Sequence, residues 1–282
     1  MKLLIKPNSY TEEFTNCDGL ILPLKNYSVD YETYFTLNEI KTIRNTFKKE
    51  IFVVINKMIF NNEIEKISII LKELDSLNIT GIFFYDLAIL QLKQDLNLKI
   101  DLVWNATHMT TNYKTCDYYH EQGVKYAYLS NEITLKETLE IKEKSQIIPM
   151  FTLIAYPPVA MSRRHLITNY NKMHNLENND YLEIEEKVTK EKYKVFENIN
   201  GTTFKYSKVL NNTEALEQLV KVDFPYLILI EDGIEHKVFI NILNIINNYL
   251  TTNSSLKEIS DLIGNNTGFL NKETIYKVKK NG

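Results

Sequence analysis

Cysteine is scarce in this chain of 282 residues, which contains only Cys17 and Cys116. Two thiols cannot supply the four thiolates of a cysteine-only zinc or iron–sulfur site, and they do not make a disulfide framework. A large excess of charge of either sign is also missing, because the chain contains 33 lysines and arginines and 36 aspartates and glutamates. The formal charge of −3 argues against binding nucleic acid by bulk charge and leaves room for a local basic patch.

A long hydrophobic run is also missing. No stretch reaches the ~18 uncharged apolar residues that a membrane-spanning helix needs. The apolar segment near the N-terminus is interrupted by Lys6 and Pro7, so it is too short for the core of an export signal. Together with the low cysteine content, these features predict a protein of the reducing cytoplasm.

Several nucleotide-binding and hydrolase motifs are absent. No GxGxxG follows the first apolar segment and GxxxxGK[ST] does not occur, so nucleotide-binding folds lose their usual sequence support. His120 and Glu121 begin an HExxH pattern, but Val124 stands where its second histidine belongs. No GxSxG elbow is present, and neither cysteine lies in a nucleophile signature. The residues themselves therefore show no peptidase centre.

The chain does contain a regular alternation of short apolar segments and amphipathic helical segments, which is typical of a parallel α/β sheet. Thr36 with Glu39, and Thr134 with Glu137, form capping-box patterns that predict two helix starts. Eight strands are predicted, at residues 3–6, 19–22, 51–56, 79–84, 100–104, 126–130, 147–153 and 226–230. This number favours a (β/α)8 TIM-type barrel over a doubly wound sheet, which gives a similar pattern.

Two segments interrupt the alternation. Residues 181–196 alternate apolar and charged side chains around a charged turn, which predicts a β-hairpin insertion before the last barrel strand, with a further strand within 198–208. In the C-terminal part we expect a helix capped at 211–213 and running to Val220, a short helix at 256–263 and a last strand at 275–278. The expected organisation is a barrel domain over 1–250, with the insertion at about 171–210, and an extension over 251–282 that packs on the barrel.

Candidate functional residues lie at the ends of the predicted strands, where barrel enzymes carry their reacting groups. Contact with water at this rim is the alternative explanation for each polar residue taken singly. The positions are Lys6, Asn56, Asp86, Asn105, Thr107, His108, Asn131, Glu132, Tyr156, Glu231 and Asp232.

The densest polar group follows the seventh predicted strand, at residues 156–170. Arg163 and Arg164 are adjacent and so point in different directions, which allows one guanidinium to face the barrel. An inward guanidinium offers a planar fork to a carboxylate or to a phosphate, including the backbone of RNA. The alternative is a solvated helix start after Pro157 and Pro158, and the residues alone leave both open.

A series of segments resembles the collagenase-like peptidase family U32, in the family's own order and over nearly the whole chain. The segments are FTLNEI at 35–40, residues 51–56 with the Asn-Asn pair at 61–62, GIFFYDLAIL at 81–90, the run 105–137, SRR to NY at 162–170, and TGFL at 267–270. The resemblance implies a barrel-type catalytic domain in a bacterial cytoplasm. Beside the peptidase label, it implies roles in hydroxylation of the tRNA wobble uridine, of ribosomal RNA or of ubiquinone precursors.

The resemblance also bears on cofactors and partners. Many members of the family carry a four-cysteine iron–sulfur cluster, and its tRNA branch depends on prephenate. Here Ala155 and Tyr156 replace the usual His-Gly, and the cluster cysteines are absent, so a cluster held by this chain alone is doubtful and the cofactor stays unknown. The short, cysteine-poor branch resembles the smaller partner of a paralogous pair.

Three hypotheses follow. The first is prephenate-dependent tRNA wobble-uridine hydroxylation, as enzyme or as cluster-free subunit, with the two arginines holding a prephenate-like carboxylate or a phosphate. The second is a peptidase, with or without metal assistance, and the third is a non-catalytic barrel partner of a paralogue. The expected catalytic residues are Asp86, His108, Glu132 and Tyr170, and the expected substrate-binding residues are Asn56, Asn105, Arg163, Arg164 and Asn169; no metal ligands are predicted.

Overall fold

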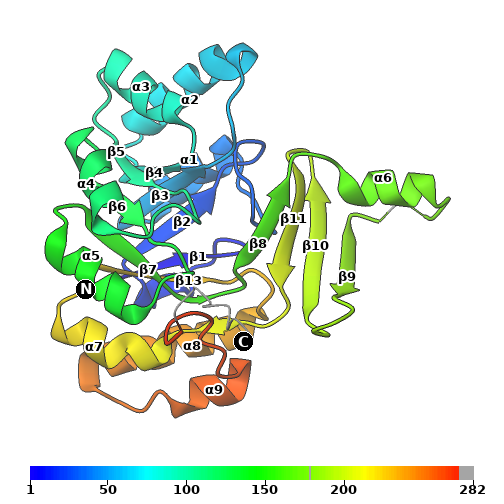
Figure 1. Cartoon of the computed structure of the whole chain (residues 1–282). Helices are drawn as coiled ribbons and strands as arrows, with labels where there is room; N and C mark the ends of the chain where they lie inside the picture. The colour runs from blue at the N-terminus through cyan, green and yellow to red at the C-terminus, as the bar shows by residue number, and fades with distance from the viewer. Residues whose placement is uncertain (178, 273–282) are drawn as a thin grey trace, which may run out of the picture.

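The predicted barrel strands close into a ring. The computed structural model describes residues 1–177 and 179–272, and in it eight parallel strands surround a common axis (Figure 1). Strands β1 to β7 pair in chain order, and β13 closes the ring between β7 and β1. The strands are β1 (Lys2–Lys6), β2 (Gly19–Pro23), β3 (Glu50–Ile55), β4 (Gly81–Phe84), β5 (Asp101–Trp104), β6 (Tyr126–Tyr128), β7 (Ile148–Ala155) and β13 (Tyr226–Ile230). The prediction of a TIM-type barrel is confirmed.

Side chains fill the interior of the barrel. Successive residues of a strand face opposite sides, so Leu4 belongs to the interior cluster while its neighbours belong to the larger cluster under the helices. Phe52 packs edge-to-face on Phe83, Tyr126 and Tyr226, with ring centroids 5.8, 5.6 and 6.2 Å away. Because the interior is a packed core, functional chemistry is confined to the ends of the barrel.

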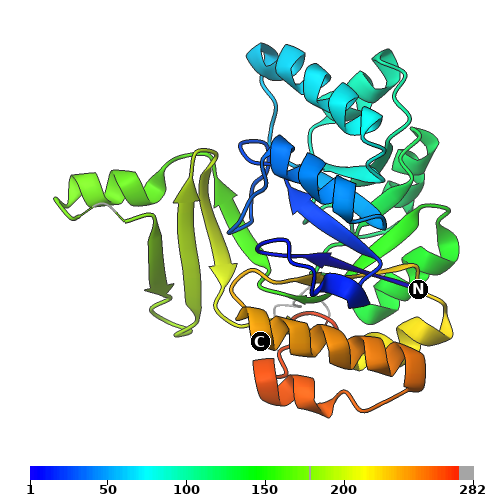
Figure 2. The same cartoon turned by 180° about the vertical axis from the view of Figure 1, so that it is seen from behind.

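Helices surround the ring (Figure 2). Five of them connect successive strands between β2 and β7: α1 (Leu37–Thr46), α2 (Ile64–Ser76), α3 (Leu87–Asp95), α4 (Tyr113–Glu121) and α5 (Leu135–Lys144). Thr36 and Thr134 complete the predicted capping boxes. Between β1 and β2 the described chain has only the short 3-10 helix η1 (Phe14–Asn16), and α8 (His236–Thr252) follows the last strand. Within the described ranges, no helix is long and apolar enough to cross a membrane.

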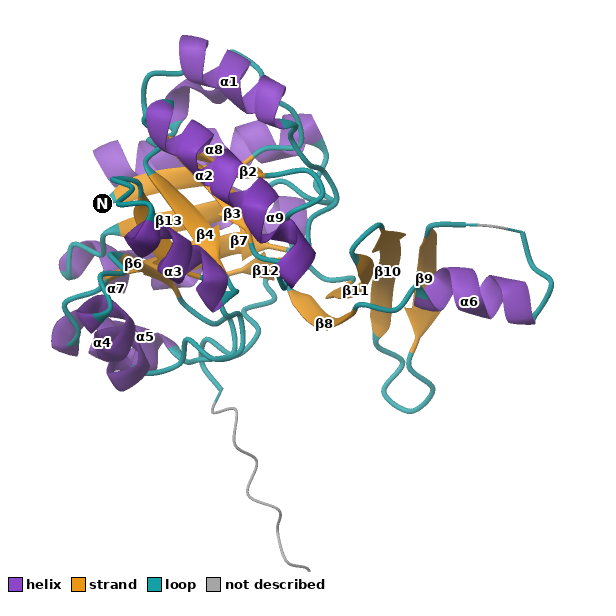
Figure 3. Ribbon diagram, turned by 90° about the horizontal axis from the view of Figure 1, so that it is seen from above, coloured by secondary structure: helices purple, strands orange, loops and turns teal. Residues whose placement is uncertain are grey.

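An antiparallel sheet projects from one side of the barrel, with a helix at its outer end (Figure 3). We call residues 158–206 the arm. The arm contains β8 (Pro158–Ser162), α6 (Leu166–Met173), β9 (Tyr181–Glu185), β10 (Lys192–Asn198) and β11 (Gly201–Tyr206), with the strands in the order β8, β11, β10, β9. The predicted hairpin is formed by β9 and β10, so an insertion before the last barrel strand is confirmed.

The chain returns to the barrel through β12 (Leu210–Asn211), η3 (Thr213–Ala215) and α7 (Leu216–Lys221). The expected helix therefore starts with a 3-10 turn. At its start Asn211 Oδ1 accepts the Thr213 backbone N–H at 3.2 Å, whereas the Asn212 side chain makes no capping hydrogen bond. Helix α9 (Lys257–Ile263) confirms the short helix expected near the C-terminus. The strand expected at 275–278 lies outside the described residues, and the domain boundary at 250 stays a prediction.

Candidate functional site

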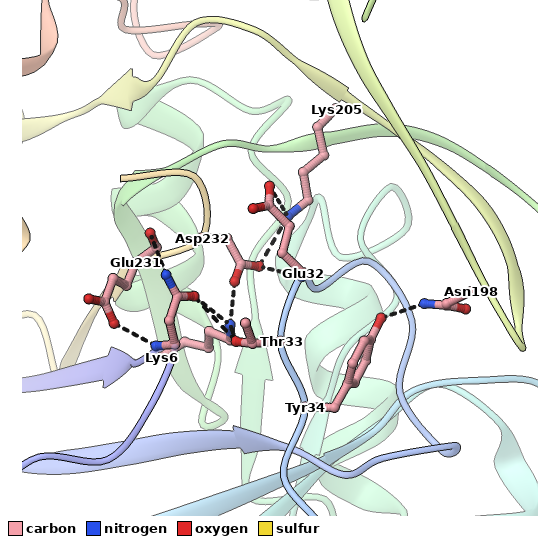
Figure 4. Close-up of polar contacts among 9 residues, drawn as sticks. Lys6, Glu32, Thr33, Tyr34, Asn198, Lys205, Glu231 and Asp232 are labelled. Atoms are coloured by element: carbon pink, nitrogen blue, oxygen red, sulfur yellow. Dashed lines mark hydrogen bonds and ion pairs between the residues drawn. The ribbon is translucent and has the colours of Figure 1, made fainter. Parts of the chain in front are cut away.

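Three charged side chains meet at the C-terminal end of the barrel (Figure 4). Lys6 is the last residue of β1, Asp232 follows β13, and Lys205 belongs to β11 of the arm. The Lys6 ammonium donates to Asp232 Oδ1, and Lys205 Nζ donates to Asp232 Oδ2 at 3.1 Å. Each of the three side chains is at most 1% exposed. This buried cluster therefore links the first barrel strand, β1, and the end of the last one, β13, to the arm.

The loop after β2 completes the surroundings of this cluster. Thr33 Oγ1 accepts a hydrogen bond from Lys6 Nζ at 2.5 Å, and the Glu32 backbone N–H donates to Asp232 Oδ2 at 3.1 Å. Burial raises the pKa of Asp232, but the Lys205 and Lys6 ammonium groups lower it more, so the net shift is downward. Burial lowers the pKa of Lys6 against the attraction of Asp232. The aspartate is therefore held ionised between two cations.

A small hollow opens beside the cluster at the mouth of the barrel. Its volume is about 30 Å³, room for one or two water molecules, and Asp30, Asn105 and Lys205 are among the residues that line it. Asn105 is 3% exposed. Neither its Oδ1 nor the Oδ1 of Asp30 has a hydrogen-bond partner in the part of the chain that the structure describes. Because a buried acceptor without a donor costs about 1–3 kcal/mol, these two atoms are places for the donor groups of a ligand.

Among the titratable groups that line the hollow, Asp30 has a pKa near neutrality. Burial raises its pKa to about 6, and Lys205, His108 and a side-chain hydrogen bond with Thr203 oppose that rise. A carboxyl group that titrates near neutrality can accept or release a proton under physiological conditions. Strand-end positions in the sequence did not point to Asp30, which lies seven residues beyond β2, or to Lys205 in the arm. A search of the sequence that also covered the loops after the strands would have included Asp30, but it would still have missed Lys205, which lies in a strand of the arm.

Two of the expected binding residues reach the hollow. Asn105 does so with its unpartnered oxygen, as described above. Asn56 also lines the hollow, but its Oδ1 accepts the Val29 backbone N–H at 2.8 Å and its amide donates to the Val29 carbonyl at 3.4 Å. Asn56 therefore holds the loop that carries Asp30.

Among the expected catalytic residues, His108 and Glu132 come together, whereas Asp86 and Tyr170 do not join them. His108 Nδ1 lies 3.0 Å from Glu132 Oε1, and both side chains are about half exposed at the rim. Asp86 is the N-cap of α3: its Oδ1 accepts the Ala88 N–H at 2.9 Å and its Oδ2 accepts the Ile59 N–H at 2.8 Å. Across the described ranges, no three His, Cys, Asp or Glu side chains come together as a metal site.

The remaining expected residues belong to the arm. Asn169 and Tyr170 lie on α6, at the outer end of the arm and not at the barrel mouth (Figure 1). Arg164 is exposed. Arg163 turns back toward the barrel, where its guanidinium lies 4.0 Å from the centre of the Phe60 ring. Of the two adjacent arginines, Arg163 is thus the one that faces the barrel.

The thiols of this chain do not fit an iron–sulfur cluster. Cys17 and Cys116 are both buried and unpaired, one beside β2 and the other in α4. Burial raises the pKa of Cys17 to about 11 and that of Cys116 to about 12, which disfavours the thiolate form that binds metal. We therefore derive no step through a cluster bound by this chain alone.

Solved structures of similar fold come from several enzyme classes. The spore cortex-lytic enzyme SleL of Bacillus cereus has a TM-score of 0.43 and 12% identity, covering 88% of this chain and 74% of that one. Phosphoribosylanthranilate isomerase of Thermotoga maritima, in a monomeric form, has a TM-score of 0.38 and 11% identity, covering 54% and 74%. Chitinase ChiW of a Paenibacillus species has a TM-score of 0.44 and 9% identity, covering 89% and 33%. Because the TM-scores and sequence identities are this low, these structures assign no activity to this chain.

Sequence relatives are more informative. The chain is 24% identical over 178 residues to a protein of Bacillus subtilis strain 168 named tRNA hydroxylation protein P2. The aligned part covers 61% of this chain and 58% of that relative, less than two thirds of its length. The model of peptidase family U32 matches residues 17–229, which include the barrel strands β2 to β7, the whole arm and all but the last residue of β13. The chain therefore belongs to peptidase family U32.

Proposed function

We propose that this protein takes part in the hydroxylation of tRNA and that the hollow at the barrel mouth is its reaction site. The observation that carries the proposal is the pair of unpartnered acceptors, Asp30 Oδ1 and Asn105 Oδ1, beside a buried cluster of charges. The name of the Bacillus subtilis relative supports tRNA as the substrate. The finer proposal, carried by the family resemblance, is hydroxylation of the wobble uridine with prephenate as co-reactant.

The proposed chemistry assigns proton transfer to this chain. Hydroxylation replaces a C–H bond of the base by a C–O bond, so a proton must leave the base. Asp30, with a pKa near 6, accepts that proton, and the Asn105 side-chain oxygen orients a donor group of the base. Oxygen and oxidant come from a co-reactant or from a partner subunit. At about 30 Å³ the hollow is too small for a base as it stands, so the proposal requires lining residues to move when the base binds.

The arginines of the arm have a separate proposed role. Arg163 and Arg164 are both exposed, so either can hold a carboxylate such as prephenate or a phosphate from solution. His108, Glu132 and Tyr170, expected from the sequence as catalytic residues, are proposed here as contacts of the substrate at the rim and on the arm. A paralogous subunit remains the proposed partner.

Mass spectrometry of tRNA nucleosides tests the proposal. A source strain that lacks this chain and any paralogue should lose the modifications derived from 5-hydroxyuridine, and plasmid-borne wild-type genes should restore them. With Asp30→Asn we expect no restoration, because the amide cannot accept the proton. The matched control is Asp95→Asn on the exposed surface of α3, which should restore them fully.

Each other outcome has a distinct meaning. If the tRNA of the deleted strain keeps the modifications derived from 5-hydroxyuridine, a role in tRNA hydroxylation is refuted and the peptidase hypothesis is favoured. Restoration by Asp30→Asn would refute the proton-transfer role and favour a non-catalytic barrel partner. No second function is proposed, because Asp86 does not join the pair of His108 and Glu132 and both of its carboxylate oxygens accept backbone N–H groups.

A further inference from the structure

A groove runs between the arm and the loop after β3, next to the hollow. Its volume is about 450 Å³, within the range of sites for small organic ligands. Lys57, Met58 and Phe60 line it from the barrel side, and Met161 and Arg163 line it from the arm. Consecutive residues connect it to the hollow: Val29 lines the groove and Asp30 the hollow, and Lys57 lines the groove and Asn56 the hollow.

The groove presents an aromatic ring stacked with a cation. Phe60 is 49% exposed, and the guanidinium carbon of Arg163 lies 4.0 Å from the centre of its ring. Arg163 Nη1 also lies 3.5 Å from the sulfur of Met58, which is 42% exposed. Flat aromatic and guanidinium groups open to solvent are the surfaces on which nucleic-acid bases stack.

The charge around this platform is positive although the whole chain is slightly negative. Among the residues that line the groove, Lys57, Lys66 and Arg163 are cationic and Glu63 is acidic, in a chain of formal charge −3. Glu63 is the carboxylate among the groove residues, and its Oε1 lies 2.5 Å from Lys57 Nζ, in an ion pair. Within the described ranges, neither Arg163 nor Lys66 of the groove has a carboxylate at ion-pair distance. The groove therefore offers two unneutralised cations to an anionic chain.

We propose that this groove binds a single-stranded segment of RNA. One base stacks on the platform of Phe60 and Arg163, phosphates contact Arg163 and Lys66, and the next nucleotide is directed to the hollow that contains Asp30. That the RNA is tRNA rests on the proposed function, whereas binding of single-stranded RNA rests on the groove itself. Backbone contacts supply affinity without selecting a sequence, so oligouridine is a suitable probe.

Fluorescence anisotropy of a labelled oligouridine, about eight nucleotides long, tests the groove with the full-length chain at several salt concentrations. The variant Phe60→Leu keeps an apolar side chain but removes the ring, and we expect binding about 10-fold weaker or more, from the loss of one stacked base. With Arg163→Ala we expect similar weakening and a salt slope reduced by about 1, from the loss of one phosphate contact.

Matched controls separate the groove from general surface effects. Tyr118→Leu removes another exposed aromatic ring, on α4, and Lys257→Ala removes another exposed cation, on α9; neither should change the affinity. Absence of RNA binding by the wild-type chain would overturn the proposal, as would equal weakening by the control variants. Capture of a protein partner through Phe60 without RNA binding would also overturn it.

Mass spectrometry of tRNA nucleosides from cells that carry the Phe60→Leu variant shows whether the groove proposal fails separately from the proposed role in tRNA hydroxylation. If Phe60→Leu abolishes oligouridine binding and the tRNA modifications together, both proposals stand. If the modifications disappear on gene deletion but Phe60→Leu restores them fully, tRNA hydroxylation stands and the groove proposal fails.

Discussion

At the scale of single residues, Asp232 is the carboxylate that pairs with two buried ammonium groups. It is fully buried and contacts both Lys6 and Lys205. Removing its charge takes the ion-pair partner away from the buried Lys6 ammonium and leaves Lys205 with the more distant Glu32, whose Oε1 lies 3.9 Å from Lys205 Nζ. Breaking such a buried arrangement costs far more than the loss of a surface ion pair.

We therefore expect Asp232→Asn to lower the free energy of unfolding by about 3–5 kcal/mol, measured by urea denaturation. The control is Glu217→Gln, which breaks a solvent-exposed pair with Lys221 and should leave the free energy of unfolding nearly unchanged. A similar small change in both variants would contradict the importance of the buried cluster.

His236 makes stability depend on pH. Its side chain is 38% exposed and lies between two carboxylates, and hydrogen bonds to Glu13 and Glu231 raise its pKa above the ordinary value of 6.5. A raised pKa in the folded state means that stabilisation is complete below 6.5 and is lost as the pH rises through the folded pKa. Partial exposure keeps the contribution small.

The corresponding prediction is that His236→Gln lowers the free energy of unfolding by about 0.5–1 kcal/mol in mildly acidic buffer and by less in alkaline buffer. Urea denaturation of both proteins across this pH range gives the difference. A difference that grows with rising pH would contradict the assignment, because it would require a lowered pKa.

At the scale of elements, the start of helix α3 allows a capping role of Asp86 to be distinguished from a catalytic one. Both carboxylate oxygens of Asp86 accept backbone N–H groups, one in α3 and one in the loop after β3. We expect Asp86→Ala to cost about 0.5–2 kcal/mol of stability and Asp86→Ser to recover part of it, because serine is also a good N-cap. Thermal unfolding measures the loss, and tRNA nucleosides from complemented cells report function. Loss of the modifications with both variants while the protein stays folded would instead assign Asp86 a catalytic role.

At the scale of the whole molecule, stability depends on the closed ring and its packed interior. Phe52 is fully buried and contacts rings from three other strands. We expect Phe52→Ala to lower the free energy of unfolding by about 3–5 kcal/mol, because the cavity would be bordered by strands that cannot collapse into it. The exposed ring of Tyr118 provides the comparison: Tyr118→Ala should cost much less. Equal losses in urea denaturation would contradict a tightly packed interior.

The local elements could be predicted because their signals are local. The eight strand segments, the two capping boxes and the hairpin of the arm each depend on residues close together in sequence, and all appear in the structure. Asn105 could also be placed at the mouth, since strand ends of a parallel barrel share one rim. Local reasoning could also have indicated Asp86 as the N-cap of α3. It could not tell that the second carboxylate oxygen accepts the N–H of Ile59, which lies 27 residues earlier in the chain.

By itself, the sequence determined a barrel of eight strands with an inserted hairpin, since the period of apolar residues selects strand or helix before distant parts meet. Only the tertiary structure decided which charges meet. Lys6 and Asp232 are 226 residues apart and come together because β13 closes the ring beside β1. Lys205 joins them because β11 brings it to the barrel mouth, and burial there gives Asp30 its raised pKa. Such contacts depend on dehydration and on closure of the whole fold, which no local pattern encodes.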